Sequence, residues 1–275
     1  MSKPIQIAVH GAAGRMGQAI MRTLIGRADV ELVAALVRSG SDLERQPLKV
    51  LLGARVPEIA CSSVLQANLA ADVLIDFSSP AAFDAALASA VERKIAFVSG
   101  TTGLSPHQQA ALDRASNSIA VLWSANFSLG VALLAHLVAQ AARALPDWDC
   151  EILEAHHNRK QDAPSGTALA LGREVAAARG QDFEAAATFS HVGVNAPRVH
   201  GSIGFSIIRA ADIVGEHTVM LATDDERIEL THRATDRDIF ARGAVAAARW
   251  IVGRAPGRYV LADVLAGVSG SLGGR

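Results

Sequence analysis

The sequence lacks three features that would place the protein outside an ordinary reducing, aqueous compartment: paired cysteines, a long apolar run and a signal peptide. Its two cysteines, Cys61 and Cys150, are far apart and have no metal-ligand spacing, so we expect two reduced, buried thiols. No stretch approaches the roughly 20 apolar residues that span a bilayer. The first apolar run is interrupted by His10 and Gly11, which is typical of a first strand and not of a signal peptide. These absences predict a cytoplasmic protein.

The sequence also lacks a dominant charge. It has 26 basic and 27 acidic residues, for a formal net charge of -1. Such a balance does not favour a nucleic-acid or membrane partner, so any anionic ligand must be held by local groups. Half of the 275 residues are hydrophobic and 19% are charged, which is enough to bury the cores of two domains.

The first half of the chain alternates short apolar runs with alanine-rich helical stretches. This alternation is typical of a parallel sheet with helices on both faces, so we predict a Rossmann-like nucleotide domain in an α/β protein. The expected strands are residues 5–10, 30–37, 73–77, 95–98 and 119–123.

The pattern changes after Phe127. A long apolar helix is expected over residues 131–145 and another helix over 165–179, among strand-like segments. This predicts an α+β domain with a mixed or antiparallel sheet, after which a helix over 239–252 returns to the first domain. We therefore assign residues 1–127 and 240–275 to the nucleotide domain, and 128–239 to a substrate-binding and oligomerisation domain. The expected strands of the second domain are residues 150–155, 204–209, 216–222 and 227–235.

A glycine-rich turn lies between the first predicted strand and the first helix. Glycine allows the backbone to approach a pyrophosphate, and the N-terminus of the helix offers N–H groups and a partial positive charge. A glycine pattern alone is weak evidence and also suits an ordinary strand–helix turn, but its place at the start of the alternating series favours a dinucleotide site. The candidate cofactor contacts here are Gly11, Ala12, Ala13, Gly14, Arg15 and Met16.

The end of the second predicted strand bears on the choice of cofactor. An acid at this place would bind the ribose hydroxyls and repel a 2′-phosphate, whereas the sequence has Val37 followed by Arg38. Arginine attracts a phosphate, so we expect NADPH to be preferred over NADH, although Arg38 could also be a solvated strand-end charge.

Loops after later strands carry small and hydroxyl-bearing residues that suit cofactor contacts, among them Gly100, Thr101 and Thr102.

The densest chemistry lies in EAHHNRKQDAPSGT, residues 154–167. An apolar strand ends in His156 and His157, a basic loop contains Lys160, and Ser165 and its neighbours open a helix with small residues and free N–H groups. This grouping suits a substrate that carries carboxylates. Hydride addition to a conjugated C=C or C=N bond requires a proton, which a histidine or lysine can supply.

Two plainer interpretations of this segment stay open. The paired histidines could be a structural surface feature, or they could bind a metal. Their spacing matches no zinc motif and neither cysteine is near enough in sequence to argue for a zinc site, so we expect no metal. His217 is not assigned a catalytic role because its location is unconstrained, and His136 lies on an apolar helix, where a core or interface position is expected.

Taken together, GAAGRMG, DFSSP, GTTG, ANFSLGV, EAHHNRKQDAPSGTA and VGEHT occur in the order typical of one family. The sequence resembles the 4-hydroxy-tetrahydrodipicolinate reductases, also called dihydrodipicolinate reductases, from residue 5 to about residue 264. The resemblance implies a homotetramer that reduces a cyclic dicarboxylate with NAD(P)H on the diaminopimelate route to lysine. It implies His156 as proton donor and acceptor and Lys160 as proton donor. It also implies substrate contacts from His157, Ser165, Gly166 and Thr167, and further cofactor contacts from Ser124, Ala125, Asn126 and Phe127.

The sequence departs from the family pattern at two positions. Some members have Glu where this chain has Val37, and some have Arg where it has Ser79, which leaves dual use of NADH and NADPH open. Two rival functions also remain at this point. One is another two-domain dehydrogenase of the aspartate family, and the other is an NADPH-sensing protein without catalysis, which would have no need for His156 and Lys160.

Overall fold

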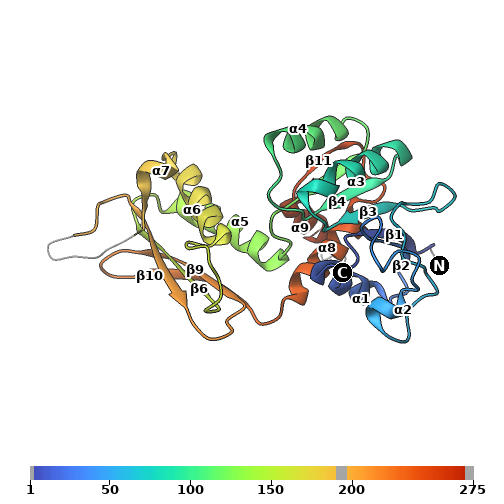
Figure 1. Cartoon of the computed structure of the whole chain (residues 1–275). Coiled ribbons are helices and arrows are strands. Elements are labelled where there is room, and N and C mark those ends of the chain that lie inside the picture. Colours follow the sequence, from blue (N-terminus) through green and yellow to red (C-terminus); the bar gives the residue numbers. More distant parts are fainter. Residues whose placement is uncertain (1–2, 190–196, 270–275) are drawn as a thin grey trace, which may run out of the picture. The chain divides into compact units, whose positions relative to one another are not determined.

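The computed structural model describes residues 3–189 and 197–269. The chain forms two compact units (Figure 1). Unit 1 comprises Met1–Leu129 and Asp238–Arg275, and unit 2 comprises Gly130–Arg237. The sequence analysis placed the boundaries at residues 127 and 240, and the roles assigned to the two domains stay predictions.

Unit 1 is built on a six-stranded sheet in the order β11-β5-β4-β3-β1-β2, and all its pairings are parallel. β3 and β4 are buried along their whole length, as expected for inner strands covered on both faces. The strand β11 was missed from the sequence because it has only three residues and no apolar run. The strands are β1 (Ile5–His10), β2 (Val30–Leu36), β3 (Val73–Asp76), β4 (Ala96–Ser99), β5 (Ala120–Trp123) and β11 (Gly257–Tyr259).

Helices cover both faces of this sheet. α3 (Pro80–Arg93) and α4 (Pro106–Ala115) bury Phe83 and Leu112 against one face, and α1 (Arg15–Leu24) and α8 (Asp238–Ile251) pack together on the other. α4 begins with a capping box at Ser105, which satisfies two amide groups of the turn. The short α2 (Lys49–Leu52) lies in the segment 41–65 that the sequence could not place, and α9 (Leu261–Ser269) ends the described chain.

Unit 2 contains a mixed five-stranded sheet in the order β10-β9-β6-β8-β7. β6 pairs antiparallel with β9 and parallel with β8, so a strand of opposite sense lies on one side of it and a strand of the same sense on the other. α5 (Leu129–Ala144) and α6 (Gly166–Arg179) bury Val138 and Leu171 against one face. The other elements are β6 (Asp149–His156), α7 (Phe183–Ala186), β7 (Ala187–Thr188), β8 (Ile203–Arg209), β9 (Gly215–Ala222) and β10 (Arg227–Ala234).

The predicted fold class is confirmed: a parallel Rossmann-like sheet is followed by a second, mixed sheet. The helix α8 belongs to unit 1. Cys61 and Cys150 are both free and buried, and burial raises the pKa of the Cys150 thiol to about 11. Within the described ranges, no helix has the length and apolarity that crossing a membrane requires.

Candidate active site

In unit 1, the turn after β1 requires glycine. Gly11 has φ +79, and a Cβ at this position would lie 2.5 Å from the carbonyl oxygen of Phe77. A Cβ at Gly17 would lie 2.2 Å from the carbonyl oxygen of Gly11, so the first turn of α1 packs directly on the loop. The two glycines therefore let the strand, the loop and the helix approach closely, as a nucleotide-binding turn requires.

The N-terminus of α1 suits an anionic ligand. Gly14 is the N-cap, and in the described structure no side chain caps the helix and no acidic residue occupies its first turn. Ala13, Gly14 and Arg15 are exposed, whereas Ala12 is buried. The first amides of a helix have no partner within the helix, so they are available to a phosphate at this end.

A buried carboxylate ties the ends of three strands together. Asp76, the last residue of β3, accepts hydrogen bonds from the hydroxyls of Ser78 (2.6 Å), Ser99 (2.9 Å) and Thr101 (2.7 Å). Its Oδ1 also lies 2.8 Å from Nδ1 of His10 at the end of β1. Burial raises the pKa of Asp76, but the hydrogen bonds more than offset burial and hold the pKa below its usual value. Asp76 was missed from the sequence, although the hydroxyl-bearing loops were noticed.

The structure places the other predicted cofactor residues in loops that follow the strands of the same sheet. A Cβ at Gly100 would lie 2.2 Å from the ring of Phe77, so this loop too is closely packed. After β5, the Ser124 hydroxyl donates to the carbonyl of Asn126 (2.6 Å), and the ring of Phe127 lies 5.2 Å from that of Phe77. Thr102, Ala125 and Arg38 are exposed, and Thr101 is buried in the Asp76 network.

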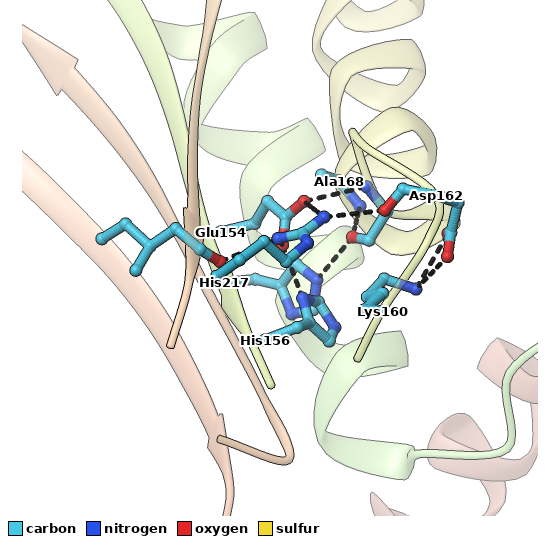
Figure 2. Close-up of polar contacts among 9 residues, drawn as sticks. Glu154, His156, Lys160, Asp162, Ala168 and His217 are labelled. Carbon is cyan, nitrogen blue, oxygen red and sulfur yellow. Dashed lines mark hydrogen bonds and ion pairs between the residues drawn. The ribbon is translucent and has the colours of Figure 1, made fainter. Parts of the chain in front are cut away.

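In unit 2, the end of β6 brings together an acid and a histidine (Figure 2). Residues two apart on a strand lie on the same face, so Glu154 and His156 lie side by side. Nδ1 of His156 is 2.5 Å from Oε2 of Glu154. Glu154 is buried, with 1% of its surface exposed, and the His156 ring is half-buried.

Glu154 has two further partners. Arg209 at the end of β8 donates from Nη1 (2.9 Å) and Nη2 (2.7 Å), and the backbone N–H of Ser165 donates to Oε1 (3.0 Å). Burial raises the pKa of Glu154, but Arg209, His156 and Ser165 together lower it below its usual value. The carboxylate is therefore ionised at neutral pH. Neither Glu154 nor Arg209 was predicted as a site residue from the sequence.

Ser165 begins α6 as its N-cap. Its hydroxyl accepts a hydrogen bond from the amide of Ala168 and lies 3.0 Å from Nε2 of His217. His217 is 4% exposed and its ring centroid is 5.1 Å from that of His156. Burial, and then the nearby His156, lower the pKa of His217 to about 4, so it is neutral near pH 7. The sequence analysis left His217 unassigned, and the structure places it within this cluster.

The loop after β6 contains the predicted ammonium group. Nζ of Lys160 lies 2.7 Å and 2.8 Å from the two carboxylate oxygens of Asp162, so Asp162 holds this side chain by an ion pair (Figure 2). His157 is half-buried. Its pKa is lowered first by burial and then by the charges of Arg237 and Arg159.

Within the described residues, no cluster of His, Cys, Asp and Glu could hold a metal ion.

Comparison with known proteins identifies the family. The family model for the N-terminal part of dihydrodipicolinate reductase matches residues 5–127, and the C-terminal model matches residues 130–265. The chain belongs to the dihydrodipicolinate reductase family. The resemblance noted in the sequence is therefore confirmed, and the chain is an NAD(P)H-dependent oxidoreductase.

Relatives support the same family over nearly the full length. The 4-hydroxy-tetrahydrodipicolinate reductase of Alkalilimnicola ehrlichii is 50% identical over 263 residues, which cover 94% of this chain and 98% of the relative. The enzyme of the same name from Stenotrophomonas maltophilia strain K279a is 47% identical, covering 95% of this chain and 98% of the relative. These matches decide against a different aspartate-family dehydrogenase and against a sensor without catalysis.

A solved structure supports the fold. The dipicolinate-bound dihydrodipicolinate reductase from Paenisporosarcina sp. TG-14 superposes with a TM-score of 0.76 at 22% identity, covering 94% of this chain and 98% of that one. A scyllo-inositol dehydrogenase from Lactobacillus casei gives a TM-score of 0.57 at 13% identity, covering 98% and 94%. The two-unit architecture is therefore shared with dehydrogenases outside the dihydrodipicolinate reductase family.

Proposed function

We propose that this chain reduces 4-hydroxy-tetrahydrodipicolinate (dihydrodipicolinate) to tetrahydrodipicolinate on the diaminopimelate route to lysine, with His156 and Lys160 managing the proton. Family membership supplies the reaction class. The observation that carries the residue assignment is the cluster at the end of β6, where two histidines, an ammonium group and the start of α6 occur within one short segment. A general acid and an anion-binding helix end are what reduction of a cyclic dicarboxylate needs.

The residues of unit 1 fit a pyridine nucleotide, whose nicotinamide supplies the hydride when bound. The loop around Gly11 has no room for a Cβ, and the N-terminus of α1 is uncapped by any described side chain. We assign Gly11, Ala12, Ala13, Gly14, Arg15 and Met16 to the phosphates and neighbouring ribose, and Gly100, Thr101, Thr102, Ser124, Ala125, Asn126 and Phe127 to the remaining cofactor contacts.

NADPH is the proposed preferred cofactor, with NADH as the alternative. Arg38 is exposed just beyond the end of β2, at the position where a dinucleotide-binding sheet meets the adenosine ribose. Its guanidinium can pair with a 2′-phosphate in a bidentate manner. Val37 is buried and offers no carboxylate to the ribose hydroxyls, which is consistent with weaker use of NADH.

The substrate carboxylates are assigned to the start of α6 and to His157. Gly166 is exposed as the first residue of the helix, next to Thr167, and amides at this end favour an anion. The amide of Ser165 is engaged by Glu154 and its hydroxyl by Ala168 and His217, so Ser165 contributes by shaping this turn. The bound ligand named for the Paenisporosarcina structure, dipicolinate, is a planar dicarboxylate of the class proposed here.

We further propose a cytoplasmic homotetramer. Two free, buried thiols suit a reducing compartment.

The sheet of unit 2 supports the proposed association. α5 and α6 cover one face of this sheet, whereas Leu153 and Ile208 on the opposite face are exposed at 36% and 50%. Apolar side chains on an uncovered sheet face favour association with another copy, which light scattering would detect as a mass of four chains.

A coupled assay tests the proposed function. Aspartate semialdehyde, pyruvate and the preceding synthase generate the substrate in place, and the absorbance of the reduced nicotinamide is followed with NADPH and NADH in separate runs. We expect oxidation that requires both the synthase and this protein, and a lower KM for NADPH than for NADH. Absence of synthase-dependent oxidation with either cofactor would contradict the proposal.

A further inference from the structure

We propose that Glu154 is a positioning residue that determines which nitrogen of His156 exchanges protons and that links this histidine to the substrate-binding turn. The proposal rests on the proposed function, in which His156 manages the proton. Its basis is that one buried carboxylate contacts His156, Arg209 and Ser165 at once. Figure 2 shows Glu154 beside His156.

The chemistry of the contact fixes the tautomer. An ionised carboxylate can only accept hydrogen bonds, so Nδ1 of His156 must be the donor at 2.5 Å from Glu154. Nε2 is then the nitrogen that exchanges its proton. A Cβ at Gly215 would lie 3.0 Å from this Nε2, so glycine at this position keeps the space beside the exchanging atom open.

Arg209 explains why a buried acid remains charged. Without a cation, burial would favour the protonated acid, which could donate a proton to Nδ1 and reverse the tautomer. Arg209 supplies two donors to Glu154, and its Nη2 also donates to the carbonyl of Asp162 (2.8 Å). Because Asp162 holds Lys160, the same ion pair connects both groups assigned to proton transfer.

The surroundings of His156 give Glu154 a distinct role. His217 on β9 is neutral near pH 7, and its ring meets that of His156 edge to face. Among the described contacts of the His156 ring, Glu154 is the hydrogen-bonded anion. Other titratable or charged groups near this end of the sheet, among the residues that the structure describes, are His157, Arg159, Lys160 and Asp162 in the loop, Arg209 on β8, Glu216 on β9, His232 and Arg233 on β10, and Arg237.

The test compares Glu154→Gln with Glu174→Gln, which makes the same change at an exposed position of α6 in the same unit. In E154Q we expect kcat to fall by about 10- to 100-fold, a part of the full contribution of a positioned acid–base group. The KM for NADPH should change little, and the alkaline limb of the kcat profile should move to lower pH, because imidazolium loses its anion. E174Q should keep the wild-type profile. An E154Q profile that coincides with wild type, or a loss confined to KM, would overturn the proposal.

A second measurement depends neither on turnover nor on the Glu154 variant. Nitrogen NMR of the wild-type histidine rings, assigned with His156→Gln, should show His156 protonated on Nδ1 and unprotonated on Nε2 at alkaline pH. The opposite tautomer would contradict the positioning role. This result is separate from the coupled assay: a wild-type protein without reductase activity would refute the proposed function, whereas the wrong tautomer in an active enzyme would refute the role of Glu154 alone.

Discussion

Each unit contains a buried carboxylate at the end of a strand, and the two carboxylates differ in their partners. Asp76 in unit 1 is surrounded by three hydroxyl groups and one imidazole. Glu154 in unit 2 is held by an arginine, an imidazole and one backbone amide. Both acids have a lowered pKa despite burial, so both are anions at neutral pH.

The different hydrogen-bond donors of Asp76 and Glu154 suit different roles for the two acids. Ser78, Ser99 and Thr101 have short side chains, so their hydrogen bonds to Asp76 fix the end of β4 and the loops that follow β3 and β4. Arg209 adds a full positive charge beside Glu154, which helps to keep this buried acid ionised. We therefore assign Asp76 to the shape of the cofactor loops and Glu154 to the chemistry of proton transfer.

The largest expected effect is a loss of kcat when His156 in unit 2 is replaced, with NADPH binding to unit 1 retained. His156→Gln removes the proposed acid of unit 2, and kcat should fall by about 10²–10⁴-fold, the usual contribution of a positioned acid–base group. NADPH affinity, measured by fluorescence titration, should remain close to that of wild type. His136→Gln, an exposed histidine on α5, serves as the matched control. Near-normal turnover in H156Q would remove His156 from the mechanism.

The next effect concerns the stability of unit 1. Asp76→Asn places an amide where three hydroxyls donate, so it loses charge-assisted hydrogen bonds, each worth about 1.5–3 kcal/mol. We expect the free energy of unfolding from urea denaturation to fall by about 2–3 kcal/mol. Asp113→Asn, which removes the surface ion pair with Arg258, should cost less than about 1 kcal/mol. Equal losses of unfolding free energy in the two variants would show that the buried Asp76 network stabilises the fold no more than a surface ion pair does.

A pH effect is expected from His217 in unit 2. Its pKa is about 4 in the folded protein and about 6.5 in an unfolded chain. Between these values the unfolded state binds more protons, so the free energy of unfolding falls as the pH falls through this window, by about 2 kcal/mol between pH 8 and pH 5. His217→Gln should flatten this slope, and exposed His107→Gln should not. An unchanged slope in H217Q would contradict the neutral, buried state of His217.

The smallest expected effect lies at the edge of unit 1. Arg38→Met should raise the KM for NADPH by about 10-fold, equivalent to about 1.4 kcal/mol, because an exposed arginine–phosphate pair is partly screened by solvent. The KM for NADH should stay within error, since NADH has no 2′-phosphate. Parallel changes with both cofactors would exclude Arg38 as the 2′-phosphate contact.

The sequence predicted the elements with strong local patterns and missed those that depend on distant partners. The parallel strands of unit 1, the helix start at Ser165 and the returning α8 were all visible as apolar runs or capping residues. β11 was missed because a three-residue edge strand has no periodicity of its own. Arg209 lies 55 positions from Glu154, so sequence spacing could not pair them.

One signal in the sequence could have pointed to Glu154. Cys150, Ile152, Glu154 and His156 alternate along β6, and the first two are fully buried. An acid on an apolar strand face has to be buried with a partner, and this rule would have identified Glu154 beside His156. His217 lies opposite Glu154 on β9, a register that the chain does not reveal before it folds.

The most direct test of the roles assigned to Asp76 and Glu154 measures NADPH binding and the pH dependence of kcat in two variants. NADPH dissociation constants and kcat–pH profiles are determined for Asp76→Asn and Glu154→Gln. Our account predicts that D76N weakens NADPH binding with the pH profile in place, and that E154Q shifts the profile with NADPH binding retained. A shifted profile in D76N, or weakened NADPH binding with a wild-type profile in E154Q, would contradict it.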